Sequence, residues 1–340
     1  MTPPLPWSHT LGTGVGSMPG EDPYEAVRVV HGELPELPYL PELPARGPGA
    51  DMIGRGAVLL TDLAVELQPS GWRLVDRPGR DLQRARDFLA RDLDALEELA
   101  GEHTGPVKVQ AVGPWTLAAS LELTYGDKAL ADHGAVLDLA ASLADGLAAH
   151  VAEVAKRLPY AQVVVQLDEP SLPAVLTAQV RTASGFGTLR SVDPMVARDR
   201  LRTVITGCGA PVLAHCCADR PPLQLLVEAG VAGLGLDLLR TAQQPGSVRD
   251  ALDGELAEAV EAGVVAALGV LAATDSPMSD LAATVGLVRE QWHRLGLATE
   301  LAATRVVLTP TCGLAGASPR YARAALVRCR EAALRLAEEG

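Results

Sequence analysis

The 340-residue sequence predicts an α/β protein, a (β/α)8 barrel of parallel strands formed as a single domain over residues 1–340. About eight short apolar runs alternate with longer helical patterns, which is the order of βαβ units around a parallel sheet. The apolar runs are nearly continuous, as expected for strands whose two faces are both covered. Polar residues collect where the runs stop, and in such barrels the reactive groups lie at the carboxyl ends of the strands.

The elements follow in chain order. Strands are expected at 11–18, 37–43, 107–112, 162–167, 212–215, 233–236, 264–271 and 306–308. Helices are expected at 22–33, from 62, at 81–99, 132–158, 193–206 and 222–229, and from 247, 279 and 319. The Pro-rich stretch 38–48 is short, so we interpret it as an active-site loop and not as a domain boundary. The first turn, 12–17, lacks the glycine spacing of a dinucleotide fingerprint, which disfavours an open doubly wound sheet.

Composition excludes several classes of function. The net charge is −13 without a basic cluster, so nucleic acid is not an expected partner. The first residues lack the pattern of a secretory signal, and the most apolar run, 263–273, is too short to span a bilayer. Five cysteines, an odd number, favour reduced thiols. We therefore predict a cytoplasmic protein that binds neither nucleic acid nor a membrane.

Soft metal ligands stand at the ends of two expected strands. His215 and Cys217 are two residues apart, so on an extended strand they share a face, while Cys216 points the other way into packing. Cys312 ends another apolar run. Imidazole and thiolates at separate strand ends are the ligands of a zinc site. The spacing alone leaves open the alternative of a buried histidine beside inert structural cysteines.

Other polar residues also follow apolar runs. A lone Asp at such a point is often a helix N-cap or a turn former. Here the polar positions are numerous and three soft ligands stand among them, which favours a common site. The remaining candidates are Ser17, Glu42, Asp168, Glu169, Asp237 and Asp275.

Several of these residues lie in motifs that together resemble a known family. The motifs are Val15-Gly16-Ser17, Gly113-Pro114-Trp115-Thr116, Gln166-Leu167-Asp168-Glu169-Pro170, His215-Cys216-Cys217 and Cys312-Gly313-Leu314. In this order they resemble the catalytic C-terminal domain of cobalamin-independent methionine synthase, within the superfamily of uroporphyrinogen decarboxylase-like barrels. The resemblance covers nearly the whole chain.

The resemblance implies a role for each candidate. Zn²⁺ would be bound by His215, Cys217 and Cys312, with Asp237 where the family has a Glu. Val15 and Ser17 would hold the carboxylate of homocysteine, and Asp168 with Glu42 its ammonium group. Asp275, in Asp275-Ser276-Pro277, stands where the family has a proton-donating His, and would take the catalytic position.

The function implied is a zinc-dependent methyltransferase that converts homocysteine to methionine. A thiol is mostly protonated at neutral pH, and coordination to zinc favours the nucleophilic thiolate. The methyl donor would be methyltetrahydrofolate or methylcobalamin, because the family's full-length enzyme uses an additional N-terminal barrel for its folate donor and this chain has no such half. The alternatives are a corrinoid- or methylcobalamin-dependent thiol methyltransferase and a non-catalytic metal- or thiol-binding module.

Overall fold

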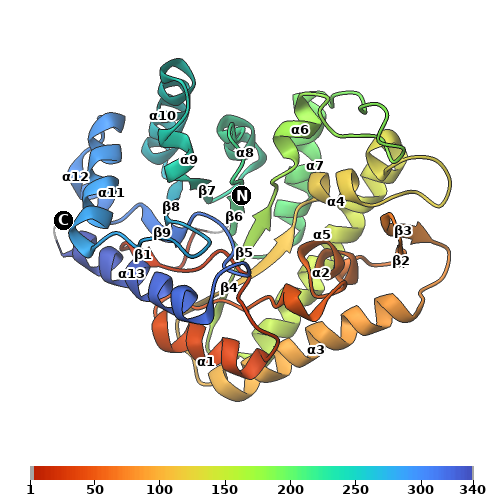
Figure 1. The fold of residues 1–340 in the computed structure, drawn as a ribbon, viewed down its shortest axis with the longest axis horizontal. Coiled ribbons are helices and arrows are strands. Elements are labelled where there is room, and N and C mark those ends of the chain that lie inside the picture. The colour runs from red at the N-terminus through yellow and green to blue at the C-terminus, as the bar shows by residue number, and fades with distance from the viewer. Residues whose placement is uncertain (1–3, 339–340) are drawn as a thin grey trace.

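The computed structural model describes residues 4–338, and their centre is a curled sheet of seven parallel strands in the order β1-β9-β8-β7-β6-β5-β4 (Figure 1). Every neighbouring pair in this sheet is parallel. The strands are β1 (Leu11–Gly12), β4 (Pro106–Val112), β5 (Gln162–Asp168), β6 (Val212–His215), β7 (Gly233–Asp237), β8 (Val265–Leu271) and β9 (Val306–Pro310). The predicted α/β class with a parallel sheet is confirmed, and the sheet forms at least a half-barrel.

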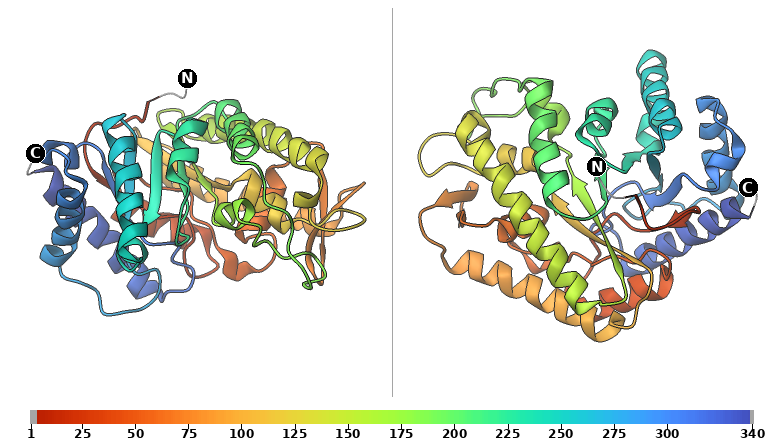
Figure 2. Two further views of the ribbon diagram at one scale, coloured as in Figure 1. Left: turned by 90° about the horizontal axis from the view of Figure 1, so that it is seen from above. Right: turned by 180° about the vertical axis from the view of Figure 1, so that it is seen from behind.

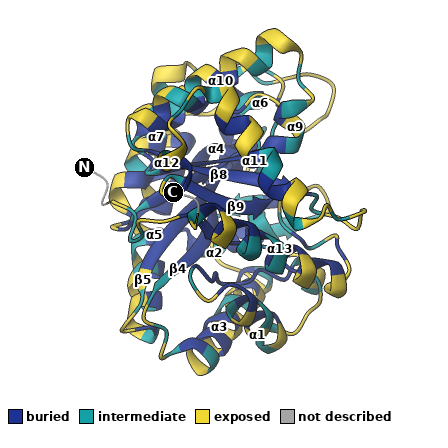
Figure 3. Ribbon diagram, turned by 90° about the vertical axis from the view of Figure 1, so that its left-hand side faces the viewer, coloured by how far each residue is buried: buried dark blue, intermediate teal, exposed yellow. Residues whose placement is uncertain are grey.

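Helices surround the sheet (Figure 2), and their buried faces are turned toward the interior (Figure 3). Many begin where an Asp side chain accepts a hydrogen bond from a backbone N–H of the first turn, as Asp22, Asp132, Asp193 and Asp280 do. The helices are α1 (Pro23–Glu33), α2 (Met52–Leu59), α3 (Arg80–Ala100), α4 (Pro114–Ser120), α5 (His133–Arg157), α6 (Leu172–Leu176), α7 (Pro194–Gly207), α8 (Leu223–Ala229), α9 (Leu238–Ala242), α10 (Gly246–Glu261), α11 (Leu281–Leu295), α12 (Thr299–Ala302) and α13 (Pro319–Ala337).

The segment 38–42 lies between β4 and the residues that follow β1. Single parallel bridges join Tyr39 to Lys108 and Ser17 to Glu42. The Leu40 N–H donates to the Lys108 carbonyl at 2.9 Å, and the Glu42 N–H donates to the carbonyl of Gly16 at 3.1 Å. The expected second strand is therefore present as an extended, bridged segment and not as a continuous ladder.

The first strand, expected at 11–18, forms a ladder only over Leu11–Gly12, and one expected helix is wrong. The helix predicted from Asp62 is replaced by an antiparallel hairpin of β2 (Ala64–Gln68) and β3 (Gly71–Val75). Asp62 has a φ of +57°, a left-handed conformation that a helix cannot contain. Apolar residues alternate along both strands, with Val65 opposite Leu74 and Leu67 opposite Trp72. The sequence could have predicted the hairpin from this alternation and from the turn before Gly71.

α5 is the one helix in the described part of the chain that is long and apolar enough to cross a membrane. Half of its most apolar window is buried inside the protein. Gly146 lets this helix pack closely on the end of α2, because a Cβ there would lie 1.5 Å from the Leu59 carbonyl oxygen. Ser142 also donates from its hydroxyl to the Thr61 carbonyl at 2.6 Å. These contacts are those of a helix packed in a protein core.

Candidate metal and substrate site

The curled sheet brings together three residues that lie far apart in the sequence. His215 ends β6, Cys217 follows two residues later, and Cys312 stands two residues beyond the end of β9. A ring nitrogen of His215 and the two sulfurs all lie within 4.8 Å of one another. The Cys217 and Cys312 sulfurs are 3.6 Å apart. Two thiolates on one tetrahedral zinc, each about 2.3 Å from the metal, would be about 3.8 Å apart.

The imidazole of His215 is placed as a metal ligand would be. The residue is buried, and its Nε2 atom makes no hydrogen bond within the described structure. A buried ring nitrogen without a partner is costly unless it binds something. Gly235 of β7 makes room for the ring, because a Cβ there would lie 2.9 Å from Nδ1. The nitrogen and two sulfurs form a donor set that suits Zn²⁺.

The two thiols share their protons unequally. The neighbouring Cys217 thiol and His215 ring lower the pKa of Cys312 to about 4, against the raising effect of burial. The hydrogen bond to Cys312, together with burial, raises the pKa of Cys217. Of the two thiols, Cys312 is the one that loses its proton more readily. Cys216 is fully buried as predicted, and burial raises its pKa to about 12.

Asp237 ends β7 but lies outside this group of three ligands. Its carboxylate caps α9 by accepting from the backbone N–H of Arg240 at 2.9 Å. The Arg240 guanidinium lies 3.7 Å from the second carboxylate oxygen. Burial raises the pKa of Asp237. In this arrangement Asp237 acts as an N-cap, and whether it also binds a metal stays a prediction.

Ser17 contacts the loop that carries Cys312. Its carbonyl accepts from the Leu314 N–H at 2.8 Å, and its hydroxyl oxygen accepts from the Ala315 N–H at 3.4 Å. A Cβ at Gly313 would lie 2.1 Å from that hydroxyl, so a side chain there would force the serine hydroxyl to turn away. The expected substrate-binding serine thus lies next to the candidate metal ligands.

Asp168 lies beside His215, since the two are paired in the register of β5 and β6. Its carboxylate is buried and accepts from Gln166 Nε2 at 2.7 Å, while no cation of the described residues lies within ion-pair distance. Burial raises its pKa to about 7. Glu42 is also buried, but its carboxylate has Arg55 Nε at 3.4 Å. Of the two carboxylates expected to bind the substrate ammonium, Asp168 is therefore the one without an ion-pair partner among the described residues.

Glu169 has a structural role that the sequence did not reveal. Its fully buried carboxylate accepts from the backbone N–H groups of Trp115 and Thr116 at 2.9 and 2.8 Å, and from the Thr116 hydroxyl at 2.6 Å. A Cβ at Gly113 would lie 2.3 Å from this carboxylate. Glu169 therefore joins the end of β5 to the start of α4, and so connects two of the motifs quoted above.

Asp275 follows β8 and is turned toward another loop. Its carboxylate accepts from the backbone N–H and the hydroxyl of Ser318, both at 2.6 Å, just before α13. These two hydrogen bonds lower its pKa. The side chain is an exposed carboxylate without a proton at neutral pH.

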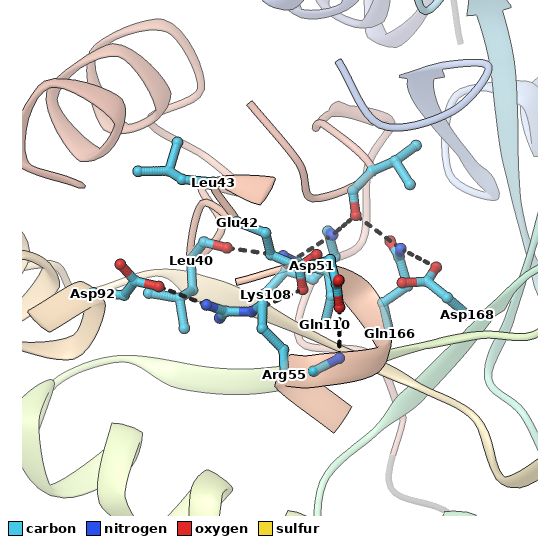
Figure 4. Close-up of polar contacts among 12 residues, drawn as sticks. Leu40, Glu42, Leu43, Asp51, Arg55, Asp92, Lys108, Gln110, Gln166 and Asp168 are labelled. Carbon is cyan, nitrogen blue, oxygen red and sulfur yellow. Dashed lines mark hydrogen bonds and ion pairs between the residues drawn. The ribbon is translucent and has the colours of Figure 1, made fainter. Parts of the chain in front are cut away.

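The interior below the site contains polar side chains that the sequence analysis missed (Figure 4). Lys108 and Gln110 of β4 and Gln166 of β5 point inward although they lie in apolar runs. The signal was available, because Lys108 with Gln110, and Gln166 with Asp168, are each spaced two apart on one face of a strand. Behind Glu42, Arg55 lies 2.5 Å from Asp92 in an ion pair that is also buried.

Residues 10–335 match the family described as "Cobalamin-independent synthase, Catalytic domain". The chain belongs to this family. The resemblance drawn from the motifs is thereby confirmed, and the family is one of enzymes. A comparison with curated proteins finds no match.

A solved structure shows a similar fold. A B12-independent methionine synthase from Shewanella sp. W3-18-1, solved with selenomethionine, is 12% identical, and the alignment covers 99% of each chain with a TM-score of 0.58. A lactate oxidase from Pediococcus acidilactici aligns with 11% identity over 97% and 94% of the two chains, at a TM-score of 0.29 that is too low to support any inference. The Shewanella methionine synthase and the present chain therefore have a similar fold over 99% of both chains.

Proposed function

We propose that this protein is a zinc-dependent methyltransferase that transfers a methyl group to the thiol of homocysteine and forms methionine. The observation that carries the proposal is the convergence of His215, Cys217 and Cys312 within 4.8 Å beside Ser17 and Asp168. Membership of the cobalamin-independent synthase family supports the same reaction.

The protein's own residues provide the remaining parts of the chemistry. His215, Cys217 and Cys312 would hold Zn²⁺, with Asp237 as a possible fourth ligand once its hydrogen bond to the Arg240 N–H is released. A bound zinc ion favours the thiolate form of a coordinated substrate thiol. Ser17 would bind the substrate carboxylate. The open carboxylate of Asp168 would pair with its ammonium, and Glu42, already paired with Arg55, would shape the subsite. Three fixed contacts orient the sulfur for in-line attack on a methyl group.

We also infer the finer architecture and location. The bridged segment 38–42 would act as the eighth strand and close the sheet into a (β/α)8 barrel. Residues 1–340 would fold as a single domain, and the protein would work in the cytoplasm, where its five cysteines stay reduced.

A second candidate keeps the thiol chemistry and changes the donor. Asp275 is ionised and bound to Ser318, so it has no proton to give to a folate leaving group. A methylcobalamin or corrinoid-protein donor leaves as a reduced cobalt centre and needs no such proton. This observation favours testing a corrinoid-dependent methyltransferase of the same superfamily.

One experiment separates the candidates. Purified protein loaded with zinc is given homocysteine with methyltetrahydrofolate or with methylcobalamin, and methionine is measured. Formation of methionine from the folate supports the first proposal, and formation only from methylcobalamin supports the second. Zinc and homocysteine binding without turnover from either donor would identify a non-catalytic binding module.

A further inference from the structure

Lys108 is a buried cation in the middle of the sheet. Its side chain is 0% exposed, and none of the described carboxylates lies within ion-pair distance of its Nζ atom. Nζ donates to the carbonyl of Val15 and to Gln110 Oε1, both at 3.0 Å, and lies 5.1 Å from the centre of the Tyr39 ring. Burying an ammonium in this way is costly, so a compensating role is expected.

The acceptors of Lys108 belong to one continuous network (Figure 4). The carbonyl of Val15 also accepts from Gln166 Nε2 at 2.8 Å, and the same Nε2 donates to Asp168 Oδ1 at 2.7 Å. On the other side, Gln110 Nε2 donates to the carbonyl of Leu40 at 2.8 Å. The network therefore runs from Asp168 to the two segments that follow β1 and precede α2.

Both carbonyls lie just before a residue of the proposed substrate site. Ser17 stands two residues beyond Val15, and Glu42 stands two residues beyond Leu40. One bridge joins Tyr39 to Lys108 of β4, and another joins Ser17 to Glu42, so neither segment forms a continuous ladder with the sheet. Side-chain hydrogen bonds therefore add to a small number of backbone hydrogen bonds in anchoring both segments. We propose that Lys108 is a positioning residue that fixes the backbone of Val15 and Leu40 and thereby sets Ser17, Glu42 and Asp168 at their mutual distances for the substrate.

The charges around Lys108 agree with this role, which rests on the proposed function. Asp168 and Glu42 are the carboxylates whose fields act on its ammonium. Burial raises the pKa of Asp168, and His215 and then Lys108 act in the opposite direction, so Lys108 adds to the compensation of this carboxylate without touching it. A cation held near Asp168, but not in contact with it, leaves the carboxylate free to meet a substrate ammonium.

The test uses Lys108→Met, which keeps an unbranched side chain only one atom shorter and removes its donors and charge. Lys156→Met, on the exposed face of α5, is the matched control. We expect the Lys108 variant to raise the KM for homocysteine by about 10- to 100-fold, the effect of losing charge-assisted hydrogen bonds, with unchanged zinc content. Hydrogen exchange should become faster in segments 13–18 and 38–42, and in the control nothing should change.

The KM for homocysteine and the hydrogen-exchange rates together distinguish a failure of the Lys108 proposal from a failure of the proposed methyltransferase function. If the wild-type protein does not methylate homocysteine, the proposed function fails, and exchange in segments 13–18 and 38–42 still tests whether Lys108 anchors them. Unchanged exchange and unchanged KM in Lys108→Met would overturn the positioning role. If that variant does not fold, Gln166→Met removes the neighbouring contacts to Val15 and Asp168, and faster exchange in 13–18 with a raised KM is expected. Wild-type values in Gln166→Met would then overturn the proposal.

Discussion

At the scale of single residues, the candidate site consists of side chains that are far apart in the sequence and are brought together by the curled sheet. Cys217 and Cys312 are separated by 95 positions in the sequence but lie 3.6 Å apart. Gly235 and Gly313 make room for His215 and Ser17 respectively, since a Cβ at either position would collide with them. The site therefore requires small residues on neighbouring elements as much as it requires the ligands themselves.

Removal of either thiol should abolish metal binding. We expect wild-type protein to contain about one zinc per chain and Cys217→Ser or Cys312→Ser to lose most of it, because two ligands hold zinc poorly. Metal analysis after gel filtration measures this. Cys216→Ala, in the same loop but turned into the core, should keep its zinc. Full zinc content in both serine variants would show that the metal assignment is wrong.

Asp168→Asn should weaken the use of homocysteine without changing the zinc content. Loss of a charge-assisted contact to the ammonium costs roughly 1.5–3 kcal/mol, which is about a 10- to 150-fold loss in kcat/KM. Asparagine keeps an oxygen that can accept from Gln166, so the melting temperature should change little. Normal kinetics with a lowered melting temperature would make Asp168 a structural residue.

The buried Lys108 should make stability depend on pH. Burial lowers its pKa to about 7 against the raising effects of Asp168 and Glu42, whereas the pKa of an unfolded lysine is about 10.4. Between these values the unfolded chain binds the extra proton, so this residue's contribution becomes more favourable as pH rises. We expect the stability of the wild type relative to Lys108→Met to rise between about pH 7 and about pH 10, and to change little below about pH 7. Urea denaturation across this pH range measures the free energy of unfolding of both proteins. A difference between them that does not change with pH would contradict the prediction.

At the scale of elements, the sequence predicted the parts whose signal is local. The strands β4 to β9 were found because near-continuous apolar runs end in polar residues. The helices were found through their periodicity and their Asp caps. The hairpin of β2 and β3 was missed because helical and alternating patterns are hard to distinguish over short apolar runs. The contacts of Glu169 with Trp115 and Thr116 could not be predicted, since they join residues more than 50 positions apart.

The junction of β5 and α4 should be sensitive to the charge of Glu169. Glu169→Gln replaces one accepting oxygen by an NH₂ group that would face the N–H of Trp115 or Thr116. One backbone donor is then left buried without a partner, and we expect a loss of roughly 1–3 kcal/mol in the free energy of unfolding. Chemical denaturation measures the loss, and Glu102→Gln, at an exposed position, should lack it. Equal stability of the two variants would contradict the structural role.

At the scale of the whole molecule, family membership and the curled parallel sheet agree with the fold expected from the sequence. The expectation of a single domain makes a measurable prediction. Differential scanning calorimetry should show one cooperative transition, with zinc shifting its midpoint upward because the ion binds only the folded state. Two transitions, of which zinc shifts only one, would instead indicate two separately folding units.

The pairing of β1 with β9 also affects how the chain folds as it is made. Leu11 pairs with Val307, and Gly12 packs so closely on α13 that a Cβ there would lie 2.7 Å from the Arg330 nitrogen. β1 therefore cannot pair until β9, about 300 residues further along the chain, has been synthesised. At about 5–20 residues per second, the ribosome needs roughly 15–60 s to deliver it. During that interval the nascent chain holds an unpaired strand edge, a stage at which a chaperone could bind it.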